Sequence, residues 1–168
     1  MINQIEANLE QLNLHGIRAG LAQRIKEAQR ESLGLEDFLG LILHDEIEER
    51  RSRRIKRLLH NAGLRQLCSL ESIDLSTARG LDKRTISDLA TMRFVREGFK
   101  VIIMGPTGVG KTFLASALGH SACRNNVVTL FFRMNHLLEQ LAWYRAKGGY
   151  LNLLKRLVGC ELLILDDF

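Results

Sequence analysis

The sequence has few of the residues that would mark a disulfide-bonded, membrane-spanning or disordered protein. It holds three cysteines and one proline in 168 residues, and only 6% of its residues are aromatic. The cysteines are odd in number and widely spaced, which fits neither a disulfide framework nor a zinc site. No run of 18 apolar residues is present to cross a membrane as a helix, and the first residues show no secretory pattern. We therefore expect a protein of the cytosol whose cysteines are reduced.

The remaining composition allows a packed globular protein with a preference for acidic partners. Apolar residues make up 46% of the chain, close to the average for soluble domains. The formal net charge of +5 favours contact with a polyanion such as DNA without requiring it. The length allows one ordinary domain, or a small domain and part of a second.

The part of the chain before residue 99 has a helical pattern. Apolar residues recur at steps of three and four from Ile2 to Leu12 and again from Ile17 to Ala28, with a break expected near Gly16. A longer helix is expected from Leu35 to about Asn61, and Gly63 fits its C-terminal end. One more helix is expected from Thr85 to Gly98, which ends it, after a linker with short turns over 69–80.

The longest predicted helix carries a charge pattern that has two interpretations. Acidic residues come first, and no acidic residue lies between Arg50 and Arg65. Acids placed before bases at four-residue spacing stabilise a helix, so the stretch can be a solvated, salt-bridged face. It can equally be a surface that binds DNA phosphates. The candidate DNA contacts are Arg50, Arg51, Arg53, Arg54, Lys56 and Arg57.

After residue 98, short apolar runs alternate with helical segments. Strands are expected over 100–104, 127–132 and 161–165 because these runs are apolar and short. Helices are expected over 111–124 and 135–157, the second with a break at the paired glycines 148 and 149. Strands that alternate with helices predict an α/β fold with a parallel sheet.

Between the first expected strand and its helix, the sequence matches the phosphate-binding pattern G-x-x-x-x-G-K-[ST] at every fixed position. Glycines let the backbone approach phosphate closely, Lys111 brings a positive charge, and Thr112 offers a hydroxyl to magnesium. The helix that follows points its positive dipole end at the phosphates. We predict that the chain binds ATP with Mg²⁺ through Gly105, Pro106, Thr107, Gly108, Val109, Gly110, Lys111 and Thr112.

Two acidic residues follow the last expected strand. Asp166 and Asp167 come directly after four apolar residues, and Asp166 lies 54 residues after Thr112. Ligands of parallel sheets bind at the carboxyl ends of the strands, where these side chains would stand. We predict that Asp166 holds the magnesium ion together with Thr112, and that Asp167 is the catalytic acid that polarises an attacking water.

At these residues the chain resembles the IstB/DnaC-like ATPases, a bacterial branch of the AAA+ group. IstB-like members are helper proteins of insertion-sequence transposition, and DnaC-like members load the replicative helicase. The resemblance includes the segments 16–22, 58–74, 80–90 and 93–98, and it covers nearly the whole chain. It implies an AAA+-type parallel sheet preceded by an all-helical N-terminal region. We expect a helical region over 1–68, a linker and lead-in helix over 69–98, and a partial P-loop ATPase domain over 99–168.

The resemblance also implies roles and partners. Lys111 corresponds to the phosphate-binding lysine, Thr112 and Asp166 to the metal-associated residues, and Asp167 to the position of the usual catalytic glutamate. The partners implied are double-stranded DNA, the transposase of the same element and, in the full-length protein, further copies of the chain, with no membrane. The chain stops at Phe168, whereas family members continue with more strands, an arginine finger and a helical lid. We therefore expect a member that is incomplete at its C-terminus and hydrolyses ATP negligibly.

Three functions remain open at this stage. The lead-in segments favour an ATP-binding helper of transposition, which contacts DNA through the basic helix. A DnaC-like helicase loader of DNA replication shares the same motifs. A non-catalytic module that binds DNA or transposase is the third reading, and the sequence end directly after the second acidic motif supports it.

Overall fold

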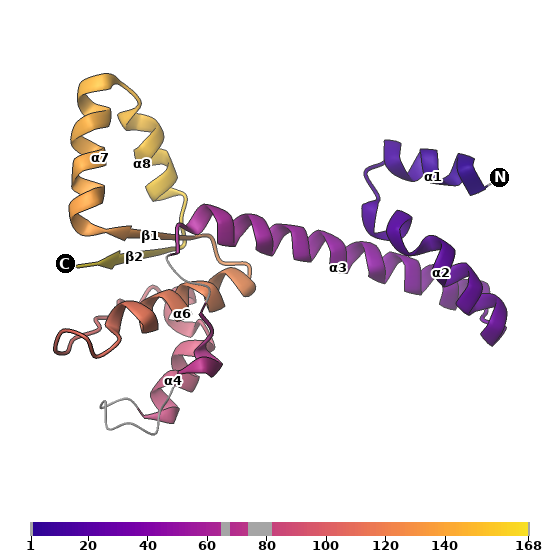
Figure 1. Cartoon of the computed structure of the whole chain (residues 1–168), viewed down its shortest axis with the longest axis horizontal. Helices are drawn as coiled ribbons and strands as arrows, with labels where there is room; N and C mark the ends of the chain where they lie inside the picture. The colour runs from indigo at the N-terminus through magenta and orange to yellow at the C-terminus, as the bar shows by residue number, and fades with distance from the viewer. Residues whose placement is uncertain (1, 65–67, 74–81, 168) are drawn as a thin grey trace. The chain divides into compact units, whose positions relative to one another are not determined.

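The computed structural model describes residues 2–64, 68–73 and 82–167. The chain forms two compact units, Met1–Arg54 and Ile55–Phe168, which are described separately below. Figure 1 shows the helices that dominate both units and the parallel strands of the second. None of the described helices is both long enough and apolar enough to cross a lipid bilayer.

The first unit is helical, as the apolar pattern predicts. It contains α1 (Ile2–Gln11), α2 (His15–Glu31) and most of α3 (Leu35–Ala62). The break expected near Gly16 lies slightly earlier, at Asn13, whose φ of 57° is left-handed. Asparagine tolerates this conformation, so it makes the turn and leaves the glycine inside α2.

Gly16 has a packing role instead, because α2 and α3 approach each other closely at this residue. A Cβ atom there would lie 2.6 Å from the carbonyl oxygen of Asp45 and 2.7 Å from Cα of Glu46. The carboxylate of Glu46 accepts hydrogen bonds from the backbone N–H groups of Gly16 at 2.7 Å and Ile17 at 3.3 Å. A side chain of α3 thereby satisfies donors that the first turn of α2 leaves without helical partners.

The second unit is built around two parallel strands, β1 (Thr129–Arg133) and β2 (Leu162–Asp166). In their register, the last residues Arg133 and Asp166 lie opposite each other. Parallel strands need a crossover, and it is made by α7 (Met134–Lys147) and α8 (Tyr150–Val158). The helix break predicted at the two glycines is confirmed, since Gly148 and Gly149 have φ values of 86° and 95°.

Helices cover both faces of this strand pair (Figure 1). On one face, Leu130 and Phe132 of β1 pack with Leu137 of α7. On the other lies α6 (Lys111–Arg124), the helix predicted over the same residues. A Cβ atom on Gly119 of α6 would lie 2.8 Å from Cδ1 of Ile164, so this glycine allows α6 to sit directly on β2. The sheet and α6 therefore form one core, which fixes the start of α6 relative to the end of β2.

Two predictions about the segments before α6 are wrong. Residues 100–104 form no strand, and Ile102 and Met104 are 80% and 86% exposed. A strand is held by hydrogen bonds to a neighbour, and no described segment pairs with these residues. The single helix expected from Thr85 is instead α4 (Lys83–Ala90) and α5 (Arg93–Arg96), separated where Met92 has a φ of 56°.

The predicted linker over 69–80 can be described only in part. Residues Leu70–Ser72 form one short 3₁₀ turn, and residues 74–80 lie outside the described part of the chain. Two of the three cysteines, Cys68 and Cys123, are buried. Burial raises the pKa of the Cys123 thiol, which favours its neutral form as a core residue.

Candidate nucleotide-binding site

The loop over 105–110 leads directly into α6. Gly108 and Gly110 have φ values of 84° and 98°, in the left-handed region that glycine adopts without a steric penalty. Gly110 is the residue that immediately precedes the helix, and the first turn of α6 contains no acidic residue. Free backbone N–H groups and the positive end of the helix dipole therefore face this loop, which suits an anion.

The side chain of Lys111 contacts the beginning of the loop. Its ammonium group donates hydrogen bonds to the carbonyl oxygens of Gly105 at 2.8 Å and Pro106 at 2.9 Å. Within the described residues, Lys111 forms no ion pair with an acidic side chain. Its charge is therefore held over the loop without being neutralised.

Thr112 and Asp166 are in direct contact. The Thr112 hydroxyl lies 2.9 Å from Oδ1 and 3.0 Å from Oδ2 of the Asp166 carboxylate. Thr112 is the second residue of α6 and Asp166 is the last residue of β2, so the packing of helix on sheet produces the contact. Oxygen atoms of this kind are ligands that Mg²⁺ prefers, and Mg²⁺ commonly takes only one or two protein ligands and fills its shell with phosphate and water. The pair fits such an ion.

The described residues contain no group of three or more His, Cys, Asp or Glu side chains able to hold a metal ion alone. A cation beside Thr112 and Asp166 would therefore need ligands from a bound nucleotide and from water. This matches the usual way in which Mg²⁺ is held at phosphate sites.

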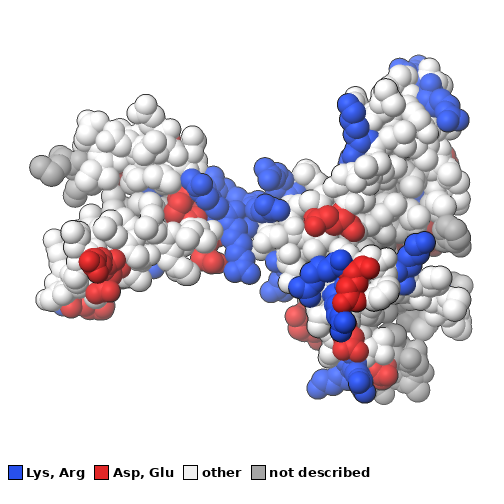
Figure 2. Space-filling model, turned by 180° about the vertical axis from the view of Figure 1, so that it is seen from behind, with Lys and Arg blue, Asp and Glu red and all other residues white. Residues whose placement is uncertain are grey.

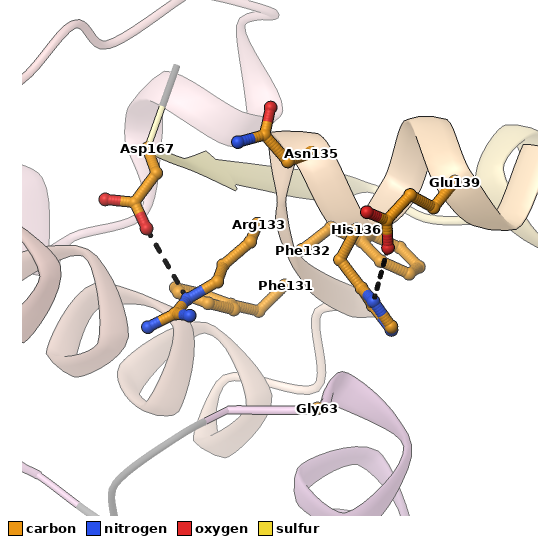
Figure 3. Close-up of a pocket in the computed structure, with 8 residues that line it drawn as sticks. All are labelled: Gly63, Phe131, Phe132, Arg133, Asn135, His136, Glu139 and Asp167. Atoms are coloured by element: carbon orange, nitrogen blue, oxygen red, sulfur yellow. Dashed lines mark ion pairs between the residues drawn. The ribbon is translucent and has the colours of Figure 1, made fainter.

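Asp167 points toward Arg133, the last residue of β1 (Figure 3). Its φ of 56° is left-handed, and its carboxylate lies 3.4 Å from Nε of Arg133. Figure 3 shows the two side chains directed at each other. Arg133 is not among the site residues predicted above. A basic residue directly after an apolar strand, at the edge where ligands of parallel sheets bind, was the signal available.

A cavity of about 510 Å³ lies beside this ion pair, at the carboxyl ends of the strands. In it, Nδ1 of His136 lies 3.8 Å from the carboxylate of Glu139, a contact that is an ion pair only when the histidine is protonated (Figure 3). None of the loop residues 105–112 lines it, so it is separate from the phosphate loop. The lining residues are Gly63, Phe131, Phe132, Arg133, Asn135, His136, Glu139 and Asp167.

The predicted basic stretch lies on α3, which is helical throughout as expected. Figure 2 shows Lys and Arg side chains gathered on this helix. Arg50, Arg51 and Arg53 each lie near a glutamate on the preceding turn, at 2.7, 3.6 and 3.3 Å. The other three candidates have no ion pair among the described residues; they are Arg54, Lys56 and Arg57.

A phosphate loop before a helix, with an acid at the end of a neighbouring parallel strand, defines a P-loop nucleotide-binding protein. Residues 7–168 match the family of IstB-like ATP binding proteins, and the chain belongs to that family.

Several curated relatives carry names that refer to insertion sequences and ATP binding. A Pseudomonas fluorescens protein named for the insertion sequence IS1162 is 37% identical over 96% of this chain and 71% of its own length. A Sinorhizobium fredii protein is 36% identical over 95% of the chain, and a Mycobacterium tuberculosis protein 32% identical over 95%. The chain spans 64% of the length of each of these last two relatives.

Proposed function

We propose that this chain is an ATP-binding helper protein of insertion-sequence transposition, which binds ATP with Mg²⁺ through its P-loop and duplex DNA through α3. The observation that carries the proposal is the contact between Thr112 and Asp166, because it joins the loop helix to the carboxylate at a strand end. The names of the relatives, which refer to insertion sequences and ATP binding, support the biological setting.

Each site residue has a separate task in this proposal. Residues Gly105 to Gly110 would surround the phosphates with backbone N–H groups, which glycine conformations permit. The ammonium of Lys111 would exchange its two carbonyl partners for phosphate oxygens, a stronger interaction because both partners are charged. Thr112 and Asp166 would hold the magnesium ion, directly or through water.

Asp167 is the candidate catalytic acid. A carboxylate in this role holds a water molecule in line with the transferring phosphoryl group. Its present partner is Arg133, so the carboxylate must turn from that guanidinium before it can act on water. Bound ATP and Mg²⁺ would supply the phosphoryl group and the divalent charge that phosphoryl transfer needs.

The proposed partners follow from charge and from the relatives. The basic side chains of α3 and the net charge of +5 suit the phosphates of duplex DNA. The transposase of the same element and further copies of the chain are the proposed protein partners. All three partners would meet the chain in the bacterial cytoplasm, where the DNA lies.

The experiment that tests this function is a binding assay with all components. Labelled duplex DNA is titrated with the chain in the presence of ATP and Mg²⁺, ADP and Mg²⁺, or no nucleotide. The transposase of a neighbouring gene is then added. We expect ATP to change DNA or transposase binding at least severalfold, and Lys111→Ala to remove this difference. DNA and transposase binding of equal strength with ATP, with ADP and without nucleotide would contradict the proposal.

The pairing of Asp167 with Arg133 favours a second candidate. If the carboxylate stays with Arg133, the chain binds ATP without hydrolysing it and acts as a nucleotide-dependent DNA- or transposase-binding module. The same assay separates the two functions when phosphate release is measured alongside binding. Measurable release would assign hydrolysis to the helper function, whereas the pairing of Asp167 with Arg133 predicts negligible release.

A further inference from the structure

The basic side chains of α3 differ in whether acidic residues of the protein already form ion pairs with them. Arg50 is the most constrained, because its partner Glu46 is only 5% exposed and also caps α2. Removing Arg50 would leave the buried carboxylate with only the more distant Arg53, at 4.0 Å, as a cationic partner, which destabilises a protein. Arg50 is therefore poorly suited to exchange its partner for a DNA phosphate.

Arg57, unlike Arg50, is not constrained by an acidic partner among the described residues. It is exposed, and no acidic side chain in the described part of the chain pairs with it. It lies one turn before Asn61 on the same side of α3, because residues four apart share a helix face.

A second arginine joins this face from a distant part of the sequence. Arg156 of α8 donates a hydrogen bond from Nη2 to the carbonyl oxygen of Asn61 at 2.9 Å. Its guanidinium also lies 5.9 Å from the ring centre of Phe132. Both contacts hold the side chain beside the last turn of α3, within the unit Ile55–Phe168. Arg156 is exposed and has no ion pair among the described residues.

We propose that Arg57 and Arg156 form one phosphate-binding face for the backbone of duplex DNA, with Asn61 as the point that joins them. The inference rests on the proposed DNA-binding function and assigns to it a residue of α8. Four residues of helix rise about 6 Å, so the two guanidinium groups can contact neighbouring phosphates of one strand. Arginine suits this task because its planar fork of donors matches phosphate oxygens.

The choice of duplex DNA follows from what surrounds the pair. Proteins that bind single strands stack bases on exposed aromatic rings, whereas Phe132 beside Arg156 is only 8% exposed. The basic side chains of the nearby cavity are less suited to phosphate, because Arg133 and His136 each face a carboxylate. Arg57 and Arg156 have no such competitor within the described residues.

The test measures binding of the chain to two unrelated labelled duplexes across a salt series. The double variant Arg57→Ala with Arg156→Gln removes both charges, while glutamine keeps an N–H donor for the Asn61 carbonyl. Lys83→Ala with Arg84→Ala is the matched control, because both residues are exposed and the change in net charge is the same. Thermal melting checks that each variant is folded, and the single variant Arg57→Ala replaces the double variant if the double does not fold.

We expect the double variant to bind both duplexes more weakly by the same factor, about tenfold for each arginine near 0.1 M salt. The slope of log affinity against log salt should become shallower by about two for the double variant, or by about one for Arg57→Ala alone. The control should keep the wild-type slope.

If the wild type shows a steep slope and the double variant keeps it, this inference is wrong and DNA binding stands. Loss of slope in the control, or preference for single strands, would also overturn it. A wild type that binds duplex DNA without salt dependence would overturn both this inference and the DNA-binding function.

Discussion

The hydroxyl of Thr112 lies 2.9 Å from the carboxylate of Asp166, across 54 residues of sequence. The contact forms because α6 packs on β2, where Gly119 leaves room for Ile164. Without that packing, a hydroxyl at a helix start and an acid at a strand end would be unrelated. The proposed binding of Mg²⁺ depends on this contact.

Removing either partner of the contact should weaken ATP binding only when magnesium is present. For Thr112→Ala and Asp166→Asn we expect a loss of about tenfold or more in the presence of Mg²⁺, the size of one interaction with a charged group. With EDTA, the affinities of wild type and variants should agree. Fluorescent nucleotide titrations with and without Mg²⁺ measure this, and an equal loss under both conditions would assign the pair a structural role.

The ion pair of Arg133 with Asp167 predicts low hydrolysis by this 168-residue chain. The acid proposed to position water faces a guanidinium instead, and errors near 1 Å in such a site can reduce a rate about a hundredfold. We expect negligible phosphate release, with or without DNA, and unchanged ATP affinity for Asp167→Asn. Turnover that DNA stimulates and Asp167→Asn abolishes would show that the carboxylate reaches its catalytic position after all.

The stability of the first unit should depend on pH through Glu46. Burial opposes ionisation of this carboxyl, but Arg50 and the N–H groups of Gly16 and Ile17 lower its pKa below the usual range. A lowered pKa in the folded state means stability that is present above the unfolded pKa and is lost as pH falls through the folded value.

Thermal melting between pH 3 and pH 7 tests the role of Glu46. Wild type should lose stability below about pH 4.3, the ordinary pKa of glutamate. Glu46→Gln should be destabilised by about 2 kcal/mol at pH 7 and show a flatter profile. The control Glu6→Gln changes an exposed carboxyl of α1 and should follow the wild type. Identical profiles for all three proteins would exclude a stabilising role of the Glu46 charge.

Two glycine substitutions should have opposite effects on the same helical unit. Gly16→Ala brings a Cβ atom within 2.7 Å of backbone atoms of α3 and should cost about 1–3 kcal/mol, because backbone cannot move aside easily. At Gly40 of α3, a Cβ atom meets nothing within 4 Å, so Gly40→Ala should stabilise the helix by about 0.5–1 kcal/mol. Urea unfolding measures both values, and a destabilised Gly40→Ala variant would contradict the packing described.

Sequence reasoning succeeded where structure depends on nearby residues. The bounds of α6 and the helix break at Gly148 and Gly149 follow from local pattern and backbone preference. It failed for residues 100–104, since a strand exists only with a partner and apolar composition does not supply one. The pairing of Arg133 with Asp167 and the cap by Glu46 depend on register and on helix packing, which single-sequence patterns do not contain.

The most direct test of the central claim is a calorimetric titration of ATP into the chain in the presence of Mg²⁺. We predict saturable binding to one site in the wild type. We also predict a loss of affinity of about tenfold or more in Lys111→Ala, which removes the one charge that the loop helix brings to the phosphates. Lys100→Ala, an exposed lysine outside the loop, serves as the control and should bind as the wild type does. Equal ATP affinity in wild type and Lys111→Ala would contradict the account.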